Sequence, residues 1–184
     1  YRLLDAMQTM NNDGTSACQS LGGDNALGVK GYISHLPLAE YHSGSIVGVD
    51  TSPCAHLACT VGADGSVRCW NYANRSLLGT AYNKVAATCV RWVPLHLDPT
   101  GRSVVVGFVD GVVRVYTLVG ENNSSITSVL CRKMVFKPHN LPVTDISFSV
   151  DGSKFASAGK DGIVFFFSCK GVSQSEPWTP VRFV

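Results

Sequence analysis

The sequence predicts an all-β fold of about three four-stranded antiparallel sheets, and two observations carry the prediction. First, one motif occurs three times, as GADGSVRCW (62–70), FVDGVVRVY (108–116) and GKDGIVFFF (159–167). Each copy joins an Asp-Gly pair to a strand-like run, with an aromatic residue six positions after the Asp. Second, no helical apolar period of useful length competes with these runs of β-branched and aromatic residues. A fixed order of turn and strand that returns along a chain is typical of a repeat architecture.

Four strands are expected in each repeat, separated by turns rich in Gly, Asp, Asn and Pro. In the first repeat the extended segments are YISHLPLAEYH (32–42), SIVGVDTSP (45–53), HLACTVG (56–62) and SVRCW (66–70). In the second repeat they are SLLGTAYN (76–83), TCVRWVP (88–94), SVVVGFV (103–109) and VVRVY (112–116). In the third repeat they are CRKMVFKPH (131–139), the two strands within VTDISFSVDGSKFASAG (143–159), and IVFFF (163–167).

The strands are apolar on both faces, which favours a propeller over a sandwich. Runs such as VVVGF and IVFFF do not alternate cleanly between apolar and polar residues, so both faces of these strands need cover. Sheets arranged radially about an axis supply this cover, because each inner sheet has a neighbour on either side. Propellers carry roughly 4–8 such blades, so we expect three blades to be an incomplete ring that neighbouring blades of a longer polypeptide close.

The predicted boundaries follow the repeats. Residues 1–30 are expected to be an irregular segment or the end of a preceding blade, and 117–130 an inserted loop. The final WTPVRFV looks like an opening strand, so 168–184 is expected to start a next blade. The three predicted blades are 31–70, 71–116 and 131–167.

The period, the four strands and the Asp-turn-aromatic motif resemble the WD-repeat family. In that family a His, a Ser or Thr, the turn Asp and a Trp form a hydrogen-bonded chain within a blade. The resemblance implies this network at His42, Thr60, Asp64 and Trp70, at His139, Ser157 and Asp161, and, in the second repeat, at Asp110 alone. The second repeat has Val106, Tyr116 and Asn83-Lys84 at the remaining positions, and the third has Phe167 in place of Trp.

A structural role is expected for these aspartates, with a catalytic Asp-His pair as the alternative. An Asp at a tight turn accepts backbone N–H groups and orients a neighbouring imidazole. The sequence has no G-x-S-x-G elbow, no phosphate-binding glycine loop, and no spacing of its five histidines that suits a metal. We therefore expect a protein that is not an enzyme and that uses no cofactor and no metal.

Composition argues against other classes of function. The net charge is +2 and no basic run is longer than Arg132-Lys133, which argues against a nucleic-acid surface. No apolar stretch approaches the roughly 18 residues of a membrane helix, so we expect no membrane partner. The seven cysteines are odd in number and form no C-x-x-C pair, which predicts reduced thiols and a cytoplasmic protein.

The resemblance to WD repeats also implies a protein-binding rim. In that family the loops before the first strand and the Asp-bearing turns gather on one side of the propeller, which commonly binds proteins or peptides. The matching positions in this sequence are Ser43, Ala63, Lys84, Val109, Asn140 and Lys160.

Two stretches, 92–115 and 135–167, resemble cilia- and flagella-associated WD-repeat proteins more closely. The shared details include Asp98-Pro99-Thr100-Gly101, Phe136-Lys137-Pro138-His139 and the strand Phe165-Phe166-Phe167. The resemblance implies a non-catalytic scaffold of the cytoskeleton, in the axoneme of a cilium or flagellum. Its implied partners are a sister axonemal WD-repeat subunit, inner-arm dynein and the doublet microtubule, joined in a tether complex. Two alternatives stay open: a cytoplasmic WD-repeat adaptor in trafficking or ubiquitin ligation, and the propeller of a hydrolase or peptidase whose active site lies elsewhere.

Overall fold

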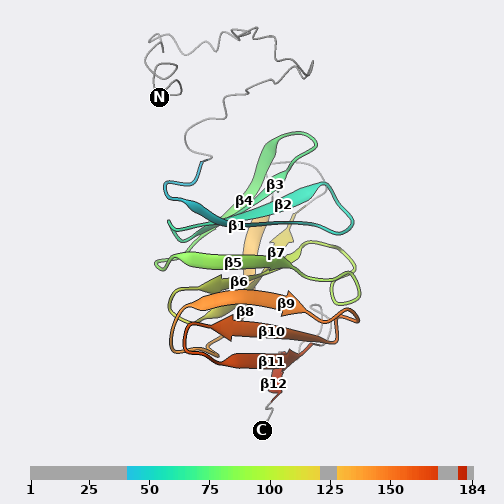
Figure 1. Ribbon diagram of the computed structural model, residues 1–184. Helices are drawn as coiled ribbons and strands as arrows, with labels where there is room; N and C mark the ends of the chain where they lie inside the picture. The colour runs from blue at the N-terminus through green and yellow to red at the C-terminus, as the bar shows by residue number, and fades with distance from the viewer. Residues whose placement is uncertain (1–40, 121–127, 170–177, 182–184) are drawn as a thin grey trace, which may run out of the picture. The chain divides into compact units, whose positions relative to one another are not determined.

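The computed structural model describes residues 41–120, 128–169 and 178–181, and within these ranges the chain forms twelve strands in three sheets (Figure 1). The first sheet contains β1 (Ile46–Thr51), β2 (Leu57–Gly62), β3 (Ser66–Asn71) and β4 (Ser76–Tyr82). The second contains β5 (Ala87–Trp92), β6 (Ser103–Phe108), β7 (Val113–Val119) and β8 (Val129–Phe136). The third contains β9 (Val143–Phe148), β10 (Lys154–Gly159), β11 (Val164–Ser168) and β12 (Thr179–Val181).

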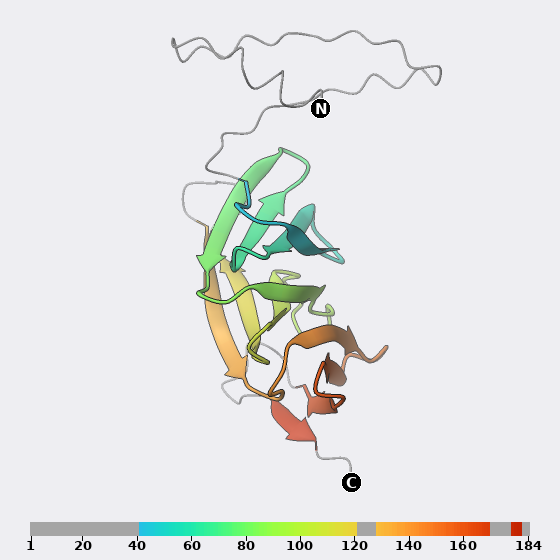
Figure 2. The same ribbon diagram turned by 60° about the vertical axis from the view of Figure 1, so that its left-hand side comes forward.

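All strand pairs within the sheets are antiparallel, and the order in each sheet follows the sequence, so the all-β prediction is confirmed. The sheets pack in chain order. Their first strands, β1, β5 and β9, lie next to one another, and the outer strands β4 and β8 run along the opposite edge (Figure 2). No helix within the described ranges has the length and apolar character needed to cross a membrane.

The sheet boundaries differ from the predicted blade boundaries by one strand. The prediction began each unit with an extended segment, but in the second and third units that segment pairs with the strand before it. Thus Ser76–Tyr82, which was expected in the unit 71–116, forms β4 and pairs with β3. In the same way Val129–Phe136 pairs with β7, although 131–167 was expected to be a unit of its own. Pairing with the nearest free edge satisfies the backbone groups of the preceding strand, and the sequence repeat does not show this.

Two further boundaries also change. The predicted loop 117–130 is shorter, because Val113–Val119 and Val129–Phe136 extend as strands into both of its ends. The predicted opening of a next blade at 168–184 contains β12 instead, which pairs with β11 and completes the third sheet. Residues 1–40 lie outside the described residues, so the prediction for 1–30 and the first part of the predicted blade 31–70 lie there too.

The hydrophobic core consists of two clusters, one between each pair of adjacent sheets. Val61 and Val67 of the first sheet pack with Val104 and Val106 of the second. The opposite face of the second sheet presents Val105, Val113 and Val115 to the third sheet, whose Ile146 and Phe155 pack against them. Every residue of β6, SVVVGF, is buried, because this strand faces a neighbouring sheet on both sides. The continuous apolar run in the sequence therefore has a direct structural cause.

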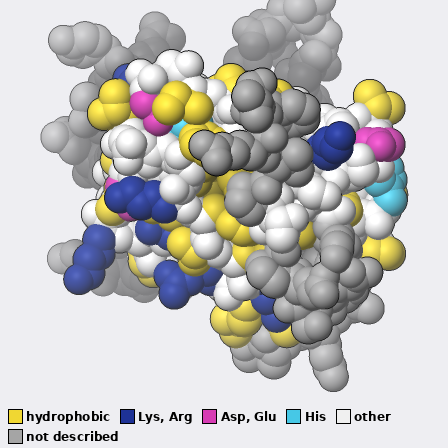
Figure 3. All heavy atoms as spheres, turned by 90° about the horizontal axis from the view of Figure 1, so that it is seen from below, with side chains coloured by type: hydrophobic (Ala, Val, Ile, Leu, Met, Phe, Trp, Pro, Cys, Tyr) yellow, Lys and Arg dark blue, Asp and Glu magenta, His cyan; other side chains and the backbone are white. Residues whose placement is uncertain are grey.

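Strand β11 of the third sheet has two accessible apolar side chains. Val164 is 52% exposed and Phe166 is 36% exposed, although both lie in a strand. Hydrophobic side chains are visible on the surface when the molecule is viewed from the end at which this sheet lies (Figure 3).

Candidate functional site

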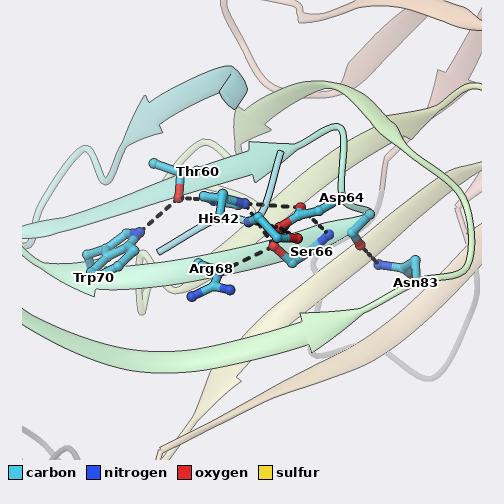
Figure 4. Close-up of polar contacts among 9 residues, drawn as sticks. His42, Thr60, Asp64, Ser66, Arg68, Trp70 and Asn83 are labelled. Atoms are coloured by element: carbon cyan, nitrogen blue, oxygen red, sulfur yellow. Dashed lines mark hydrogen bonds and ion pairs between the residues drawn. The ribbon is translucent and has the colours of Figure 1, made fainter. Parts of the chain in front are cut away.

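The first sheet contains a chain of hydrogen bonds that joins its turn to its third strand (Figure 4). Trp70 Nε1 donates to Thr60 Oγ1 at 2.8 Å, and Thr60 Oγ1 lies 2.8 Å from His42 Nε2. His42 Nδ1 lies 3.2 Å from Asp64 Oδ1. A neutral imidazole satisfies all these contacts if Nδ1–H donates to the carboxylate and Nε2 accepts the threonine hydroxyl proton. The structure thus brings together the four residues that the first repeat offered.

Ser66 is a member of this network that the sequence reasoning missed. Its hydroxyl lies 2.8 Å from both Asp64 Oδ1 and His42 Nδ1, and its N–H donates to the same carboxylate at 3.0 Å. Burial alone would raise the pKa of Asp64. Hydrogen bonds from Ser66, His42 and the N–H of Ser43 outweigh burial and hold that pKa well below its usual range. A small polar residue two positions after an Asp at a turn was the available signal.

The third sheet repeats two of these three contacts, those of the histidine, and lacks the contact of the indole. His139 Nδ1 lies 3.0 Å from Asp161 Oδ1, and His139 Nε2 lies 2.9 Å from Ser157 Oγ. Burial raises the pKa of Asp161, but N–H donors of Asn140 and Ile163, together with His139, lower it overall. Phe167 has no N–H to donate and instead stacks on Phe155, with ring centroids 4.5 Å apart and planes at 6°. Packing of aromatic rings therefore replaces the final hydrogen bond of the chain.

The second sheet uses a different set of contacts. Asp110 accepts the N–H of Val112 at 3.1 Å and lies 3.6 Å from Arg114 Nη2, so its carboxylate meets a guanidinium in place of an imidazole. Tyr116, at the Trp position, donates its hydroxyl to Asn83 Oδ1 at 2.8 Å. Asn83, at the His position, in turn donates to the Gly65 carbonyl oxygen of the first sheet at 3.0 Å. The sequence reasoning retained only Asp110 in this repeat and missed this bridge between sheets.

The predicted rim residues lie on the loops and turns at one end of the strands, and all six are exposed. Ala63, Val109 and Lys160 stand one position before the three turn aspartates, and their N–H groups bond to the preceding loops. The N–H groups of Ser43 and Asn140 donate to Asp64 and Asp161 at 2.9 and 3.1 Å. The polar networks thus fix the backbone of the rim at Ser43 and Asn140, while the rim residues themselves stay exposed.

The histidines of the two networks and two buried cysteines of the described sheets are engaged in contacts with neighbouring side chains. His42 and His139 are bonded through both ring nitrogens. In the part of the chain that the structure describes, no three His, Cys, Asp or Glu side chains gather to hold a metal ion. Cys59 and Cys69 are fully buried and face each other across β2 and β3, and the contact with Cys69 and burial raise the pKa of the Cys59 thiol. The arrangement is suited to rigidity and to presenting a surface.

Comparison with known proteins identifies the family to which this fold belongs. Residues 46–174 match the family model of the fourth β-propeller of WDR90. The chain belongs to the WDR90 fourth β-propeller family. The expectation of a WD-repeat propeller is therefore confirmed, and the three four-stranded sheets are WD blades.

Relatives of this WDR90-type propeller include cilia- and flagella-associated proteins. The chain is 33% identical to cilia- and flagella-associated protein 44 of Mus musculus in an alignment of 138 residues that covers 71% of the chain. It is 30% identical to the protein of the same name from Chlamydomonas reinhardtii in an alignment of 147 residues that covers 78% of the chain. The chain spans only 8% of the length of each of these relatives. The predicted resemblance to cilia- and flagella-associated WD-repeat proteins is confirmed.

A solved structure shows the same fold. A chain in the crystal structure of the mitotic checkpoint complex superposes with a TM-score of 0.58 at 20% identity. The match covers 70% of this chain and 37% of that chain.

Proposed function

We propose that this WDR90-type propeller segment is a non-catalytic protein-interaction scaffold within an axonemal protein of cilia or flagella. The observation that carries the proposal is the identity of 33% to a cilia- and flagella-associated protein over 71% of the chain. Both histidines are hydrogen-bonded through their two ring nitrogens to side chains of these networks, and Asp64 and Asp161 accept backbone N–H groups, which supports a role without catalysis.

The finer role follows from the resemblance to cilia- and flagella-associated WD-repeat proteins. We propose a place in the tether complex that links inner-arm dynein to the doublet microtubule, with a sister axonemal WD-repeat subunit as partner. The exposed rim residues supply the surface for such contacts. The exposed apolar face of β11, with Val164 and Phe166, supports packing by a further blade of a longer polypeptide.

The test is to express the full-length protein with a tag in ciliated cells and to fractionate isolated axonemes. We expect the tag in the axonemal fraction, retained after detergent extraction and recovered together with inner-arm dynein subunits. A signal confined to the cytoplasm would contradict the proposal and would favour a general WD-repeat adaptor. Hydrolase or peptidase activity of the purified full-length protein, abolished by a substitution outside this chain, would favour the propeller of an enzyme.

A further inference from the structure

Five backbone segments form one continuous surface along the rim. The turns 63–65, 109–111 and 160–162 alternate with the loops 83–86 and 139–142. The N–H of Asn83 donates to the Gly65 carbonyl at 3.0 Å, and the N–H of Val109 donates to the Ala86 carbonyl at 3.1 Å. Beyond them, the N–H of His139 donates to the Gly111 carbonyl at 3.3 Å, and the N–H of Lys160 to the Pro142 carbonyl at 2.8 Å. We call this surface the rim strip.

The side chains on the rim strip follow a definite order. Lys84 comes first, two residues before the Ala86 carbonyl that holds Val109. Val109 comes next, and Leu141 follows it. Leu141 stands directly before Pro142, whose carbonyl accepts the N–H of Lys160, the last residue in this order. Val109 is 40% exposed and Leu141 is 50% exposed, and both lysines are exposed. In the order of the segments, two accessible apolar residues thus stand between two exposed lysines.

The carboxylates of the rim strip are already engaged in hydrogen bonds or ion pairs, and their side chains are 9% (Asp64), 10% (Asp161) and 32% (Asp110) exposed. Asp64 and Asp161 accept bonds from their histidines and from backbone N–H groups. Asp110 lies beside the Arg114 guanidinium. Asp145, at the start of the neighbouring strand β9, is paired with Arg91 at 3.0 Å. The exposed charged side chains of the strip are therefore its two lysines, Lys84 and Lys160.

We propose that the rim strip binds an extended acidic segment of a partner protein, in which two apolar side chains lie between carboxylates. This inference rests on the proposed function as a protein-interaction scaffold and names the chemistry of the partner. The apolar side chains would cover Val109 and Leu141, and the carboxylates would pair with Lys84 and Lys160. A second copy of the chain is a poorer fit, because two rim strips facing each other would bring lysines against lysines.

The test uses the full chain and three fluorescent synthetic peptides. The probe is Glu-Glu-Leu-Val-Glu-Glu, and the controls are Glu-Glu-Ser-Ser-Glu-Glu and Lys-Lys-Leu-Val-Lys-Lys. Fluorescence anisotropy measures binding at low and at high salt. We expect the probe to bind about tenfold more tightly than either control, and to weaken several-fold as salt screens the lysines. Equal binding of all three peptides, or preference for the basic peptide, overturns the proposal.

Variants locate the binding on the rim strip. We expect Lys84→Glu and Lys160→Glu each to weaken probe binding by about fivefold, and the pair Val109→Ser and Leu141→Ser together by about tenfold. Lys133→Glu on β8 and Val150→Ser on the β9–β10 hairpin change exposed residues of the same kinds away from the strip, and should leave binding unchanged. Equal effects of rim and control variants overturn the assignment.

Two outcomes would overturn the proposal of an acidic partner without contradicting the proposed scaffold function. If sedimentation shows that the chain self-associates, and the lysine variants do not, the strip binds a second copy of the chain. That result would overturn the proposal of an acidic partner. Full-length protein that reaches the axoneme, although the chain binds no acidic probe, would overturn the inference and leave the proposed function standing.

Discussion

Alanine at Gly111 and at Gly162 separates the cost of backbone conformation from the cost of packing between sheets. Both glycines follow a turn aspartate, with φ of +78° and +77°, where residues with a Cβ are disfavoured. Their surroundings differ. A Cβ on Gly111 would overlap the carbonyl oxygen of His139 and lie 3.0 Å from that of Leu141, whereas no described heavy atom lies within 4 Å of a Cβ on Gly162.

The shared conformational cost should lower the free energy of unfolding by about 1–2 kcal/mol in Gly162→Ala. Gly111→Ala carries the same cost and must also displace the loop 137–142, and overpacking of this kind costs about 1–3 kcal/mol. We therefore expect Gly111→Ala to lose about 2–5 kcal/mol in total. The assay is urea unfolding of the full chain followed by far-ultraviolet circular dichroism. Equal losses in the two variants would refute the reasoning that this loop packs on the turn.

Three further predictions concern the polar networks. Thr60→Val leaves Trp70 Nε1 and His42 Nε2 without their shared partner and should cost about 2–4 kcal/mol in urea unfolding; Ser157→Ala, which affects His139 alone, should cost less, and the reverse order would contradict the network. Tyr116→Phe removes the bond to Asn83 and should speed amide hydrogen exchange in the loop 83–86 while leaving 137–142 unchanged; unaltered exchange in 83–86 would argue against the bridge. The pKa of Asp64 is lowered by folding, so its stabilisation is present above the unfolded pKa of about 3.9 and is lost as pH falls through the folded value. Asp64→Asn should therefore flatten the loss of stability below about pH 4, and an unchanged slope in acid titration would count against this role.

Much of the fold could be predicted because its determinants are local. Asp-Gly pairs mark the turns, and runs such as VVVGF need cover on both faces, so the strands and their packing in layers follow from short stretches. The sheet boundaries could not be predicted in this way. Whether Ser76–Tyr82 pairs backward with β3 or forward with β5 depends on which free edge is nearer, and the repeat pattern is the same in both cases.

The site shows the same division. His42, Thr60, Asp64 and Trp70 stand at motif positions, and the structure places them within hydrogen-bonding distance of one another. The Tyr116–Asn83 bond joins two residues that depart from the motif. Neither substitution predicts the bond by itself, because each residue is the hydrogen-bond partner of the other. The exposure of Leu141 depends on the path of the loop, which apolar character in the sequence does not reveal.

The shift of one strand between repeat and sheet determines where the polypeptide can be divided. A cut after Trp70 or Tyr116 follows the motif, but it removes the outer strand and leaves the edge of β3 or β7 without a hydrogen-bonding neighbour. The unpaired N–H and C=O groups of that edge could form hydrogen bonds with other chains, so such a fragment would tend to aggregate. Cuts within 83–86 or 137–142 keep each group of four strands whole. Recombination or shortening of the gene at these two loops would therefore yield intact building blocks.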